Sequence, residues 1–317
     1  MSLLELRHLS KTYPGPNGAV VQAVSDVSLT IEAGEVLGVV GESGCGKSTL
    51  GRALLRLIEP SGGEILLDGK DLVQLSRRAM KPVRRDLQVI FQDPFGALNP
   101  RHTVGGIIGE PLKVHRIGTR AEQQARIAEL LDLVGLPQDA AGRYPHEFSG
   151  GQRQRIAIAR ALALNPRLLV ADEAVSALDV SIQSQIINLI ADLQKRLGLS
   201  ILFISHDLSV IRHVSDRIAV MYLGRVVETG PTETIMQAPK HPYTKALLSA
   251  IPRPGVARQQ RIVLQGELPD PAHPPAGCAF HTRCPSVMPV CRQTRPALQP
   301  LDSSQKGEVA CHLYPVQ

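Results

Sequence analysis

The 317-residue sequence contains no tryptophan and only five phenylalanines and five tyrosines. With so few rings, a sandwich with aromatic layers is a poor fit, and a core of Ile, Leu, Val and Ala is more typical of an α/β protein. Apolar residues make up 43% of the chain and charged residues 20%, which excludes wholesale disorder. The length suggests two domains, or one large domain with an appendage.

The sequence also has no run approaching about 20 uninterrupted apolar residues, so we expect that the chain does not itself cross a membrane. Its first residues, MSLLELRHLSK, alternate apolar and polar side chains and do not resemble a secretory signal. We therefore expect the chain in the cytoplasm, where thiols stay reduced. A solvated surface explains most of the net charge of +6, which is also compatible with binding phosphates, nucleic acid or an anionic membrane face.

Strand patterns open the chain and recur along it. Two alternating segments are separated by the turn-rich residues 14–18, and later apolar runs are typical of strands buried on both faces. The predicted strands cover residues 3–10, 27–35, 35–41, 61–69, 86–93, 167–173 and 200–207, and residues 217–230 have the pattern of a hairpin with Gly224 at its turn.

Helical periodicity dominates residues 98–165, which we interpret as a helical insertion. One helix is predicted near residues 119–135 and another from 152 to Pro166. A third follows at 181–198, and its predicted apolar face consists of Ile182, Ile186, Leu189, Ile190, Leu193 and Leu197. Strands that alternate with helices predict a mostly parallel sheet covered on both faces. After Pro231 the pattern weakens into a loop-rich tail.

A glycine-rich loop carries the first chemical motif. Residues 41–48, GESGCGKS, fit G-x-x-x-x-G-K-[ST] between a predicted strand and a predicted helix. Glycines let successive N–H groups face phosphate oxygens, and the helix N-terminus adds a favourable dipole. Lys47 brings a positive charge to the β- and γ-phosphates, and Ser48 offers a hydroxyl to Mg²⁺. Cys45 occupies a free position, where its backbone matters; a redox role is the alternative.

Polar residues follow three other predicted strands. Asp172 and Glu173 end an apolar strand, where two carboxylates are costly unless they serve a cation or a proton. Asp172 can hold Mg²⁺ through water, and Glu173 can polarise a water for in-line attack. Gln92 can ligate Mg²⁺ or orient that water, and His206 can contact the γ-phosphate.

A second anion-binding helix start lies 20 residues before Asp172. Residues Ser149, Gly150, Gly151 and Gln152 open the helix RQRIAIARALAL, and a Ser and two glycines at a helix N-terminus favour phosphate. One chain therefore presents two phosphate-binding surfaces, an arrangement found in few NTPase families.

With these motifs in this order, residues 3–250 resemble the ATP-binding subunits of ABC transporters. The resemblance implies an α/β fold with a RecA-like P-loop NTPase core and mostly parallel sheet, an N-terminal antiparallel β subdomain, a helical signature subdomain and a loop-rich, Cys-containing C-terminal extension. The implied domains are a cassette at 1–250, with its helical subdomain at about 98–165, and an extension at 251–317.

The same resemblance assigns the motifs. Residues 41–48 are similar to Walker A, Gln92 to the Q-loop, 149–152 to the signature, 168–173 to Walker B and 176–179 to the D-loop. The implied catalytic residues are Glu173, His206, Lys47 and Gln92, and the implied Mg²⁺ ligands are Ser48, Gln92 and Asp172. The implied nucleotide-binding residues are Tyr13 (stacked on adenine), Gly41, Glu42, Ser43, Gly44, Cys45, Gly46, Lys47, Ser48, Thr49, Ser149, Gly150, Gly151, Gln152 and Asp179.

In that family two cassettes pack head to tail, and the signature of one covers the ATP held by the other. ATP hydrolysis opens the pair, and the motion acts on membrane subunits. The resemblance thus implies an ATPase on the cytoplasmic face of the inner membrane, working with two permease subunits and, indirectly, a solute-binding protein. A related but distinct ATPase is the expected partner, giving a heterodimer.

A finer resemblance is to the dipeptide/oligopeptide/nickel importer subfamily, and within it to the F-type dipeptide importer ATPases. It is carried by FQDPFGALNPR, VSALDVSIQ, HPYTKALLSAIP and GELPDPAHPPAGCAFHTRCP. Ala174 departs from the family pattern, in which proline follows the Walker B glutamate. Nickel, glutathione or another small solute remain alternative cargoes, because the cargo never touches this subunit.

Four cysteines lie in the last 40 residues: Cys278, Cys284, Cys291 and Cys311. A proline-rich tail has little core of its own, so a metal could staple it. Four thiolates suit zinc or an iron–sulfur cluster, and the spacing does not separate them. Resemblance to importer subunits implies [4Fe–4S]; unliganded thiols are the third interpretation.

Two other functions use related motifs. Soluble ABC ATPases that act on nucleic acid or ribosomes share Walker A and the signature, but they typically have long coiled coils or two cassettes in one chain, and this sequence has neither. A P-loop kinase of a small molecule has no use for the signature. Both are weaker interpretations than an ABC transporter subunit.

Overall fold

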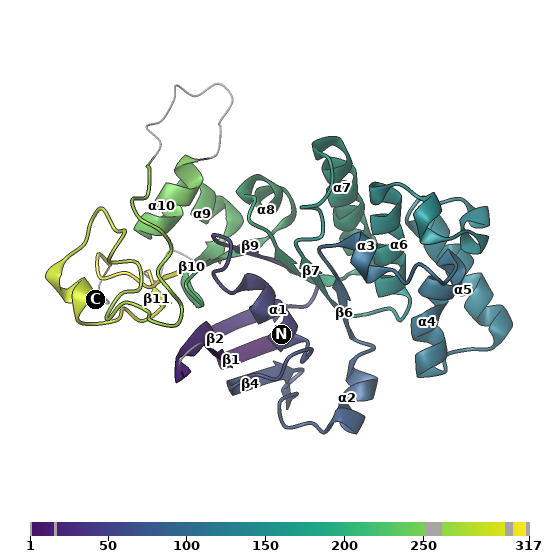
Figure 1. Cartoon of the computed structure of the whole chain (residues 1–317), viewed down its shortest axis with the longest axis horizontal. Coiled ribbons are helices and arrows are strands. Elements are labelled where there is room, and N and C mark those ends of the chain that lie inside the picture. The colour runs from purple at the N-terminus through teal and green to yellow at the C-terminus, as the bar shows by residue number, and fades with distance from the viewer. Residues whose placement is uncertain (1, 16–17, 251–261, 302–306, 315–317) are drawn as a thin grey trace. The chain divides into compact units, whose positions relative to one another are not determined.

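A computed structural model describes residues 2–15, 18–250, 262–301 and 307–314 (Figure 1). The chain divides into two compact units. The first unit comprises Met1–Ile31, Glu35–Val73 and Ser205–Gln317, and the second comprises Glu32–Gly34 and Gln74–Ile204. Within the described residues, none of the helices combines the length and the apolar character that a membrane span requires.

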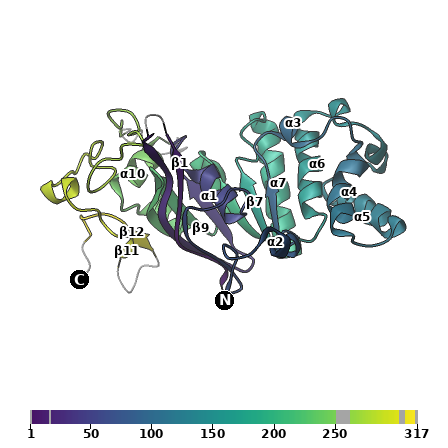
Figure 2. The ribbon, with the colours of Figure 1, turned by 60° about the horizontal axis from the view of Figure 1, so that its bottom comes forward.

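An antiparallel sheet of order β2-β1-β4-β5 forms one layer of the first unit. Alternation along β1 buries Leu4 and Leu6, as expected of a strand with one face on the core, and Leu9 is buried after the pairing register shifts between Arg7 and Ser10. Helix α1 packs against β1 (Figure 2). The elements are β1 (Ser2–Pro14), β2 (Val20–Glu32), β4 (Gly62–Leu67), β5 (Lys70–Asp71) and α1 (Lys47–Leu54), so the first two strands are longer than their sequence patterns predicted.

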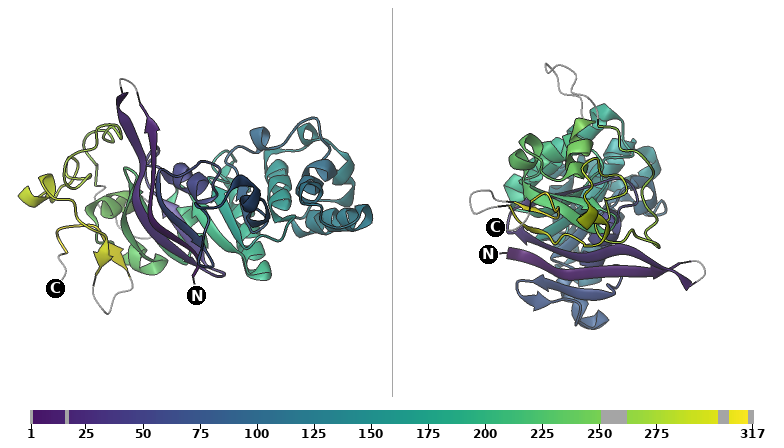
Figure 3. Two further views of the ribbon diagram at one scale, coloured as in Figure 1. Left: turned by 90° about the horizontal axis from the view of Figure 1, so that it is seen from below. Right: turned by 90° about the vertical axis from the view of Figure 1, so that its left-hand side faces the viewer.

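The other sheet portion of the first unit has the order β11-β12-β10-β9-β3. All five residues of β3 are buried, and β3 pairs in parallel with β9. Strand β10 pairs with β9 on one side and β12 on the other, which attaches the C-terminal extension to the sheet (Figure 3). The bounds are β3 (Val36–Val40), β9 (Arg217–Tyr222), β10 (Arg225–Pro231), β11 (Gln299–Pro300) and β12 (Glu308–Val309).

Short helices also belong to the first unit: α8 (Leu208–Val214), α9 (Thr232–Gln237) and α10 (Pro242–Ser249). Gly224 has a φ of 76° at the turn of the predicted β9–β10 hairpin. The sequence analysis missed α9 and α10, because helices of six and eight residues are too short to show a clear periodicity. Beyond α10, the described part of the extension contains only the 3₁₀ turn Pro289–Arg292 and the two short strands.

The second unit contains three parallel strands in the order β8-β7-β6. The strands are β6 (Leu87–Ile90), β7 (Leu168–Asp172) and β8 (Ser200–Ile204), and β7 and β8 are buried throughout. Parallel strands that are covered on both faces read as continuous apolar runs, which is why the sequence predicted them.

Helices make up the rest of the second unit. Helices α4, α5 and α6 pack on one another, and α6 also contacts α3 and α7 (Figure 1). Their presence confirms the predicted helices between residues 98 and 165. The bounds are α2 (Arg77–Val83), α3 (Pro94–Ala97), α4 (Val104–His115), α5 (Arg120–Leu133), α6 (Gly150–Leu162) and α7 (Val180–Leu197), with 3₁₀ turns at Gln138–Gly142 and Pro145–Glu147.

One detail of the predicted α7 face is wrong. Leu197 is 45% exposed, whereas Ile187, which the prediction omitted, is buried. Leu197 occupies the last helical position before the left-handed C-cap Gly198, where the helix end leaves it in solvent. The central residues Ile186, Ile190 and Leu193 are buried as predicted.

Candidate nucleotide site

The phosphate loop connects β3 to α1 in the first unit, and two of its glycines are required by close backbone contacts. A Cβ atom at Gly41 would lie 2.2 Å from the carbonyl oxygen of Met221. At Gly46 it would lie 2.1 Å from the carbonyl oxygen of Ala23, and φ there is 103°. The loop therefore takes its shape from contacts with β2 and β9, which only glycine permits.

Lys47 is buried, and its ammonium is held by the loop itself. The Nζ atom donates to the carbonyl oxygens of Gly41 at 2.8 Å and Glu42 at 3.0 Å. At the start of α1, the N-cap Gly46 offers no side-chain hydrogen bond to the helix N–H groups. A helix N-terminus next to a buried cation is a favourable place for phosphate.

Cys45 is 1% exposed. Burial raises the pKa of its thiol, with the positive charge of Lys47 acting in the opposite direction. A thiol with a raised pKa is a poor nucleophile, so this environment supports the interpretation of Cys45 as a bystander.

Two residues far along the chain contact the phosphate loop, and the sequence analysis missed both. The backbone N–H of Glu42 donates to the hydroxyl of Tyr243 at 2.9 Å, and the Glu42 carboxylate pairs with Arg283 at 2.7 Å. Tyr243 and Arg283 belong to segments that the resemblance singled out, HPYTKALLSAIP and GCAFHTRCP, but no local pattern assigned either one a role.

In the second unit the structure brings Gln92 and Glu173 together. The Gln92 Nε2 atom donates to Glu173 Oε2 at 3.0 Å, across 81 residues of sequence. Glu173 has a φ of 49°, and its N–H donates to the carbonyl oxygen of Ile204 at 3.0 Å. Asp172, at the end of β7, is 3% exposed, and Ala174 is buried. The strand end thus holds a buried carboxylate next to a more accessible one that an amide positions.

The predicted signature residues form the N-terminus of α6. The Ser149 N–H donates to Gln152 Oε1 at 3.0 Å, and the Gln152 N–H donates to Ser149 Oγ at 3.4 Å, which is a capping box. A Cβ atom at Gly151 would lie 2.5 Å from Cγ2 of Ile182 on α7. Close packing of α6 on α7 therefore requires a glycine at position 151.

The remaining predicted site residues lie as follows. Tyr13 is exposed, with the Lys11 ammonium 4.9 Å from its ring centroid. His206 is exposed and precedes Asp207, the N-cap of α8. Asp179 is the N-cap residue of α7 and makes no side-chain capping bond. Tyr13, the phosphate loop and His206 belong to the first unit, whereas Gln92, the signature, Asp172, Glu173 and Asp179 belong to the second.

The four tail cysteines are free thiols that lie near one another. Burial raises the pKa of Cys278 to about 11, and the other three cysteines add to this rise. Three of the sulfur atoms accept a hydrogen bond from the backbone N–H two residues further along the chain. The pairs are Cys278 with Phe280, Cys284 with Ser286, and Cys311 with Leu313. Yet within the described residues no group of three or more His, Cys, Asp or Glu side chains is arranged to hold a metal ion. The predicted metal site is therefore not confirmed.

A buried lysine in a phosphate loop, strand-end carboxylates with a bound glutamine, and a second helix N-terminus opened by Ser-Gly-Gly together define an ATP-binding cassette. Comparison with known families agrees. A family profile described as ABC transporter matches residues 24–176, and one described as the C-terminal region of oligopeptide/dipeptide transporters matches residues 227–291.

Relatives of known name extend over nearly the whole chain. The oligopeptide transport ATP-binding protein AppF of Bacillus subtilis is 52% identical over 323 residues, covering 99% of this chain and 98% of the relative. A putative peptide import ATP-binding protein of Brucella abortus is 54% identical over 298 residues, covering 94% of each. The chain belongs to the ABC transporter ATP-binding proteins, and specifically to the ATPases of peptide importers.

Solved structures confirm the fold class. A dimeric ATP-binding cassette in a post-hydrolysis state, bound to ADP and phosphate, matches with a TM-score of 0.66 and 31% identity over 72% of this chain and 98% of that one. The protein cbiO1 of Clostridium perfringens, part of the ABC transporter complex cbiONQ, matches with a TM-score of 0.66 and 29% identity over 75% of this chain and 91% of that one. The predicted α/β P-loop fold and ATPase activity are thereby confirmed.

Proposed function

We propose that the chain binds MgATP at residues 41–49 and hydrolyses it between two head-to-tail cassettes, and that this drives uptake of dipeptides or oligopeptides. The hydrogen bond from Gln92 to Glu173 carries the proposal, since it orients one carboxylate at the end of β7 next to the buried Asp172. A positioned carboxylate is the group that activates water for attack on the γ-phosphorus.

Different residues of the chain bind the phosphates, activate the water and bind the adenine. Lys47 leaves its carbonyl partners for the β- and γ-phosphate oxygens, and the N–H groups at the start of α1 bind the same anion. Glu173 takes the proton of the attacking water, which Gln92 and His206 orient. Oxygen atoms of Ser48, Gln92 and Asp172 would hold Mg²⁺, whose charge would neutralise that of the phosphates. Tyr13 stacks on the adenine ring.

The assembly is also part of the proposal. Residues 149–152 and Asp179 act on the ATP of a partner cassette, which we expect to be a related but distinct ATPase. Two permease subunits receive the motion on the cytoplasmic face of the inner membrane, and a solute-binding protein delivers the cargo to them. The cassette spans residues 1–250 and the extension 251–317; part of the boundary, residues 251–261, lies outside the described residues.

The names of the relatives support peptides as the cargo. Nickel, glutathione or another small solute would require the same ATPase chemistry, because the solute contacts other subunits. Binding assays on the solute-binding protein of the assembled transporter would decide among them: tight binding of dipeptides supports the proposal, and binding of nickel or glutathione alone contradicts it.

A [4Fe–4S] cluster on the four tail cysteines completes the proposal, with zinc as the alternative. Support comes from four neighbouring thiols and from the three N–H···S hydrogen bonds, which favour a ligated sulfur. Anaerobic purification followed by absorbance spectroscopy and by iron and zinc assays tests it. A colourless product without iron or zinc would refute both metals.

The substitution Glu173→Gln tests the catalytic assignment. It removes the base but keeps the shape, so we expect ATP binding within about twofold of wild type and turnover at least a hundredfold slower in the assembled transporter. Glu129→Gln on the exposed face of α5 is the matched control and should retain wild-type turnover. Wild-type turnover in Glu173→Gln would show that another group activates the water.

A further inference from the structure

The C-terminal extension contacts the phosphate loop through an ion pair between Arg283 and Glu42. Arg283 Nη1 lies 2.7 Å from Glu42 Oε2, and Nη2 lies 3.1 Å from Oε1, which is a bidentate arrangement between residues 241 positions apart. The Arg283 side chain is only 7% exposed, compared with 29% for Glu42. A bidentate guanidinium–carboxylate pair fixes orientation as well as distance. The pair is therefore a specific attachment between the two segments.

A ring cluster anchors the segment that carries Arg283. Phe280 is 1% exposed and packs on Tyr222 and Tyr243 with ring centroids 5.2 and 5.5 Å apart. Tyr243 and Tyr222 meet edge to face at 4.7 Å. Because the Tyr243 hydroxyl accepts the Glu42 N–H, the cluster and the ion pair hold the same residue of the loop from two directions.

Glu42 connects this attachment to the phosphate-binding lysine. Its carboxylate binds Arg283, and its carbonyl oxygen accepts a hydrogen bond from Lys47 Nζ at 3.0 Å. A change at Arg283 thus reaches Lys47 through a single intervening residue.

We propose that Arg283 is a positioning residue for nucleotide binding: it holds Glu42, and with it the loop 41–47, in the conformation from which Lys47 meets the phosphates. The inference rests on the proposed ATP site and adds a role for the extension, which supports the phosphate loop of its own chain. A segment flanked by Cys278 and Cys284 carries this contact, so the conformation of the cysteine-containing tail affects ATP affinity.

The test measures the Kd for a fluorescent ATP analogue on the full chain. Arg283→Ala and Glu42→Gln should each weaken binding by about tenfold, since hydrogen bonds to charged groups contribute about 1.5–3 kcal/mol and this pair is partly screened. Arg283→Lys keeps the positive charge but cannot form the bidentate pair, so its Kd should lie between those of wild type and Arg283→Ala. Arg292→Ala, an exposed arginine in the same segment, is the control and should bind like wild type.

The double variant Glu42→Gln/Arg283→Ala distinguishes a positioning role from a general loss of fold. If the pair acts as a unit, the double variant binds no more weakly than the weaker single variant. Faster hydrogen exchange at residues 41–48 in Arg283→Ala, with an unchanged melting temperature, would agree. Effects that multiply, or wild-type affinity in Arg283→Ala, would overturn the inference. Failure of the wild-type chain to bind ATP would instead contradict the proposed function.

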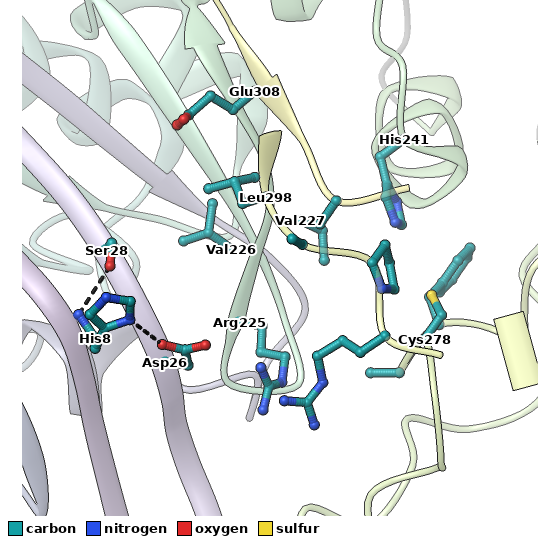
Figure 4. Close-up of a pocket in the computed structure, with 16 residues that line it drawn as sticks. His8, Asp26, Ser28, Arg225, Val226, Val227, His241, Cys278, Leu298 and Glu308 are labelled. Carbon is teal, nitrogen blue, oxygen red and sulfur yellow. Dashed lines mark hydrogen bonds and ion pairs between the residues drawn. The ribbon is translucent and has the colours of Figure 1, made fainter. Parts of the chain in front are cut away.

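The first unit also contains a cavity of about 390 Å³ (Figure 4). It is lined by residues of β1, β2, β10 and the extension. Two arginines, Arg225 and Arg295, contribute to its lining, and Figure 4 shows Arg225 at the end away from Glu308. Apolar walls come from Val226, Val227 and Leu298. A volume of this size is within the range of small-molecule sites.

Arg225 experiences one like charge and one opposite charge, those of Arg295 and Asp26. Its Nη2 donates to the hydroxyl of Ser25, a neutral partner. Asp26 is the nearby acid, and its carboxylate already binds His8 Nδ1 at 2.7 Å. Burial and the like charge of Arg295 lower the pKa of Arg225 to about 10. Two guanidiniums that repel each other next to a cavity form a site that an anion stabilises.

We infer that this cavity binds a small organic oxyanion with an apolar group, the oxyanion on Arg225 and Arg295 and the apolar group on the valines and Leu298. The test uses calorimetry on the full chain with the nucleotide site filled by a non-hydrolysable MgATP analogue. Probes are 4-methylpentanoate, phenyl phosphate and the neutral 4-methylpentanamide. The first two distinguish carboxylate from phosphate sources, and the amide should not bind.

Arg295→Ala should weaken binding of the preferred anion at least tenfold, and because Arg295 is exposed the variant should fold. Arg292→Ala is again the control and should bind the anion like wild type. The inference is overturned if neither anion binds saturably at millimolar concentration, if the amide binds equally well, or if Arg295→Ala binds the anion like wild type.

Discussion

Helices α1 and α6 both begin at a motif for phosphate, yet their N-termini differ. At α1 the cap is Gly46 in a left-handed conformation, with no side-chain hydrogen bond to the helix. At α6 the cap is Ser149, whose hydroxyl and backbone N–H both exchange hydrogen bonds with Gln152. The second N-terminus therefore satisfies one of its N–H groups with a capping side chain, which the glycine cap of the first cannot provide.

The difference matches the parts that the two helices play in the proposed mechanism. α1 binds the nucleotide of its own cassette, so a helix N-terminus next to Lys47 favours binding before any partner arrives. α6 meets a nucleotide only when a second cassette brings it, and the capping box keeps the helix start ordered until then. Both sites therefore use a helix N-terminus to bind phosphate. The site at α1 acts within its own cassette, whereas the site at α6 acts only after a partner cassette has bound.

Removing the cation next to the N-terminus of α1 should have the largest effect. Lys47→Ala leaves the helix dipole and the backbone N–H groups but takes away the charge that faces the β- and γ-phosphates. We expect ATP affinity to fall by a hundredfold or more, which corresponds to about 2.7 kcal/mol. Titration of the variant with a fluorescent nucleotide measures this; Lys113→Ala on α4 is the control. Affinity within threefold of wild type would show that the backbone alone binds the phosphates.

Replacing a glycine at either helix start should have the next largest effect, a loss of stability. Gly46→Ala places a Cβ atom 2.1 Å from a backbone oxygen, and Gly151→Ala places one 2.5 Å from a side-chain methyl of Ile182. Both should lower the unfolding free energy by about 2 kcal/mol or more. Only the second can be relieved by the truncation Ile182→Ala, because a side chain can be shortened and a backbone cannot. Urea unfolding of the single and double variants tests this, and rescue failing at Gly151 would contradict the packing described.

A third N-terminus adds a pH-dependent case. At α10 the Nδ1 atom of the buried His241 accepts the Tyr243 N–H, and burial lowers the pKa of His241 to about 3. The unfolded chain takes up a proton on this ring below about pH 6.5 and the folded chain does not, so stability is present above pH 6.5 and is lost as pH falls toward 3. The loss should approach about 1.4 kcal/mol per pH unit.

His241→Asn keeps a capping side chain and removes the titration. We expect the variant to lose less stability than wild type between pH 6.5 and 4.5, measured as the difference between the two in urea unfolding at each pH. The raised pKa of the buried Glu228, which accepts the His241 N–H, affects both proteins and cancels in that difference. Parallel stability curves for the two proteins would show that His241 does not remain neutral in the folded state.

Removing the cap of α6 should have the smallest effect on the isolated chain. Ser149→Ala loses one side of the capping box, which typically costs about 1 kcal/mol of stability. ATP affinity of the single cassette should stay unchanged, while turnover in the assembled transporter should fall. Thr119→Ala, which removes the capping box of α5, is the matched control and should lower stability similarly without affecting turnover.

Local sequence patterns were sufficient for the parts of the molecule that local physics determines. Apolar runs located β3, β7 and β8, and the G-x-x-x-x-G-K-S spacing placed Lys47 at the start of α1, because strand, turn and helix follow one another along the chain. The S-x-x-Q sequence at 149–152 likewise carries its own capping partner. These predictions needed no contact between distant segments.

The contacts that the sequence did not reveal are long-range ones. Glu42 and Arg283 are 241 residues apart. The local sequence around each residue does not indicate which side chain it pairs with. Tyr243 was visible only as part of a resemblance, since the packing that directs its hydroxyl to Glu42 depends on Tyr222 and Phe280. The tail cysteines lie near one another, but their spacing in the sequence does not determine whether their geometry suits a metal, and the predicted metal site is not confirmed.

The most direct test of the account is the mass in solution of the Glu173→Gln chain mixed with its partner cassette, measured by light scattering with and without MgATP. If ATP joins the phosphate loop of one cassette to the Ser149 helix start of the other, MgATP produces a stable two-cassette complex, and Ser149→Arg on the facing helix prevents it. An identical mass with and without MgATP would contradict the account.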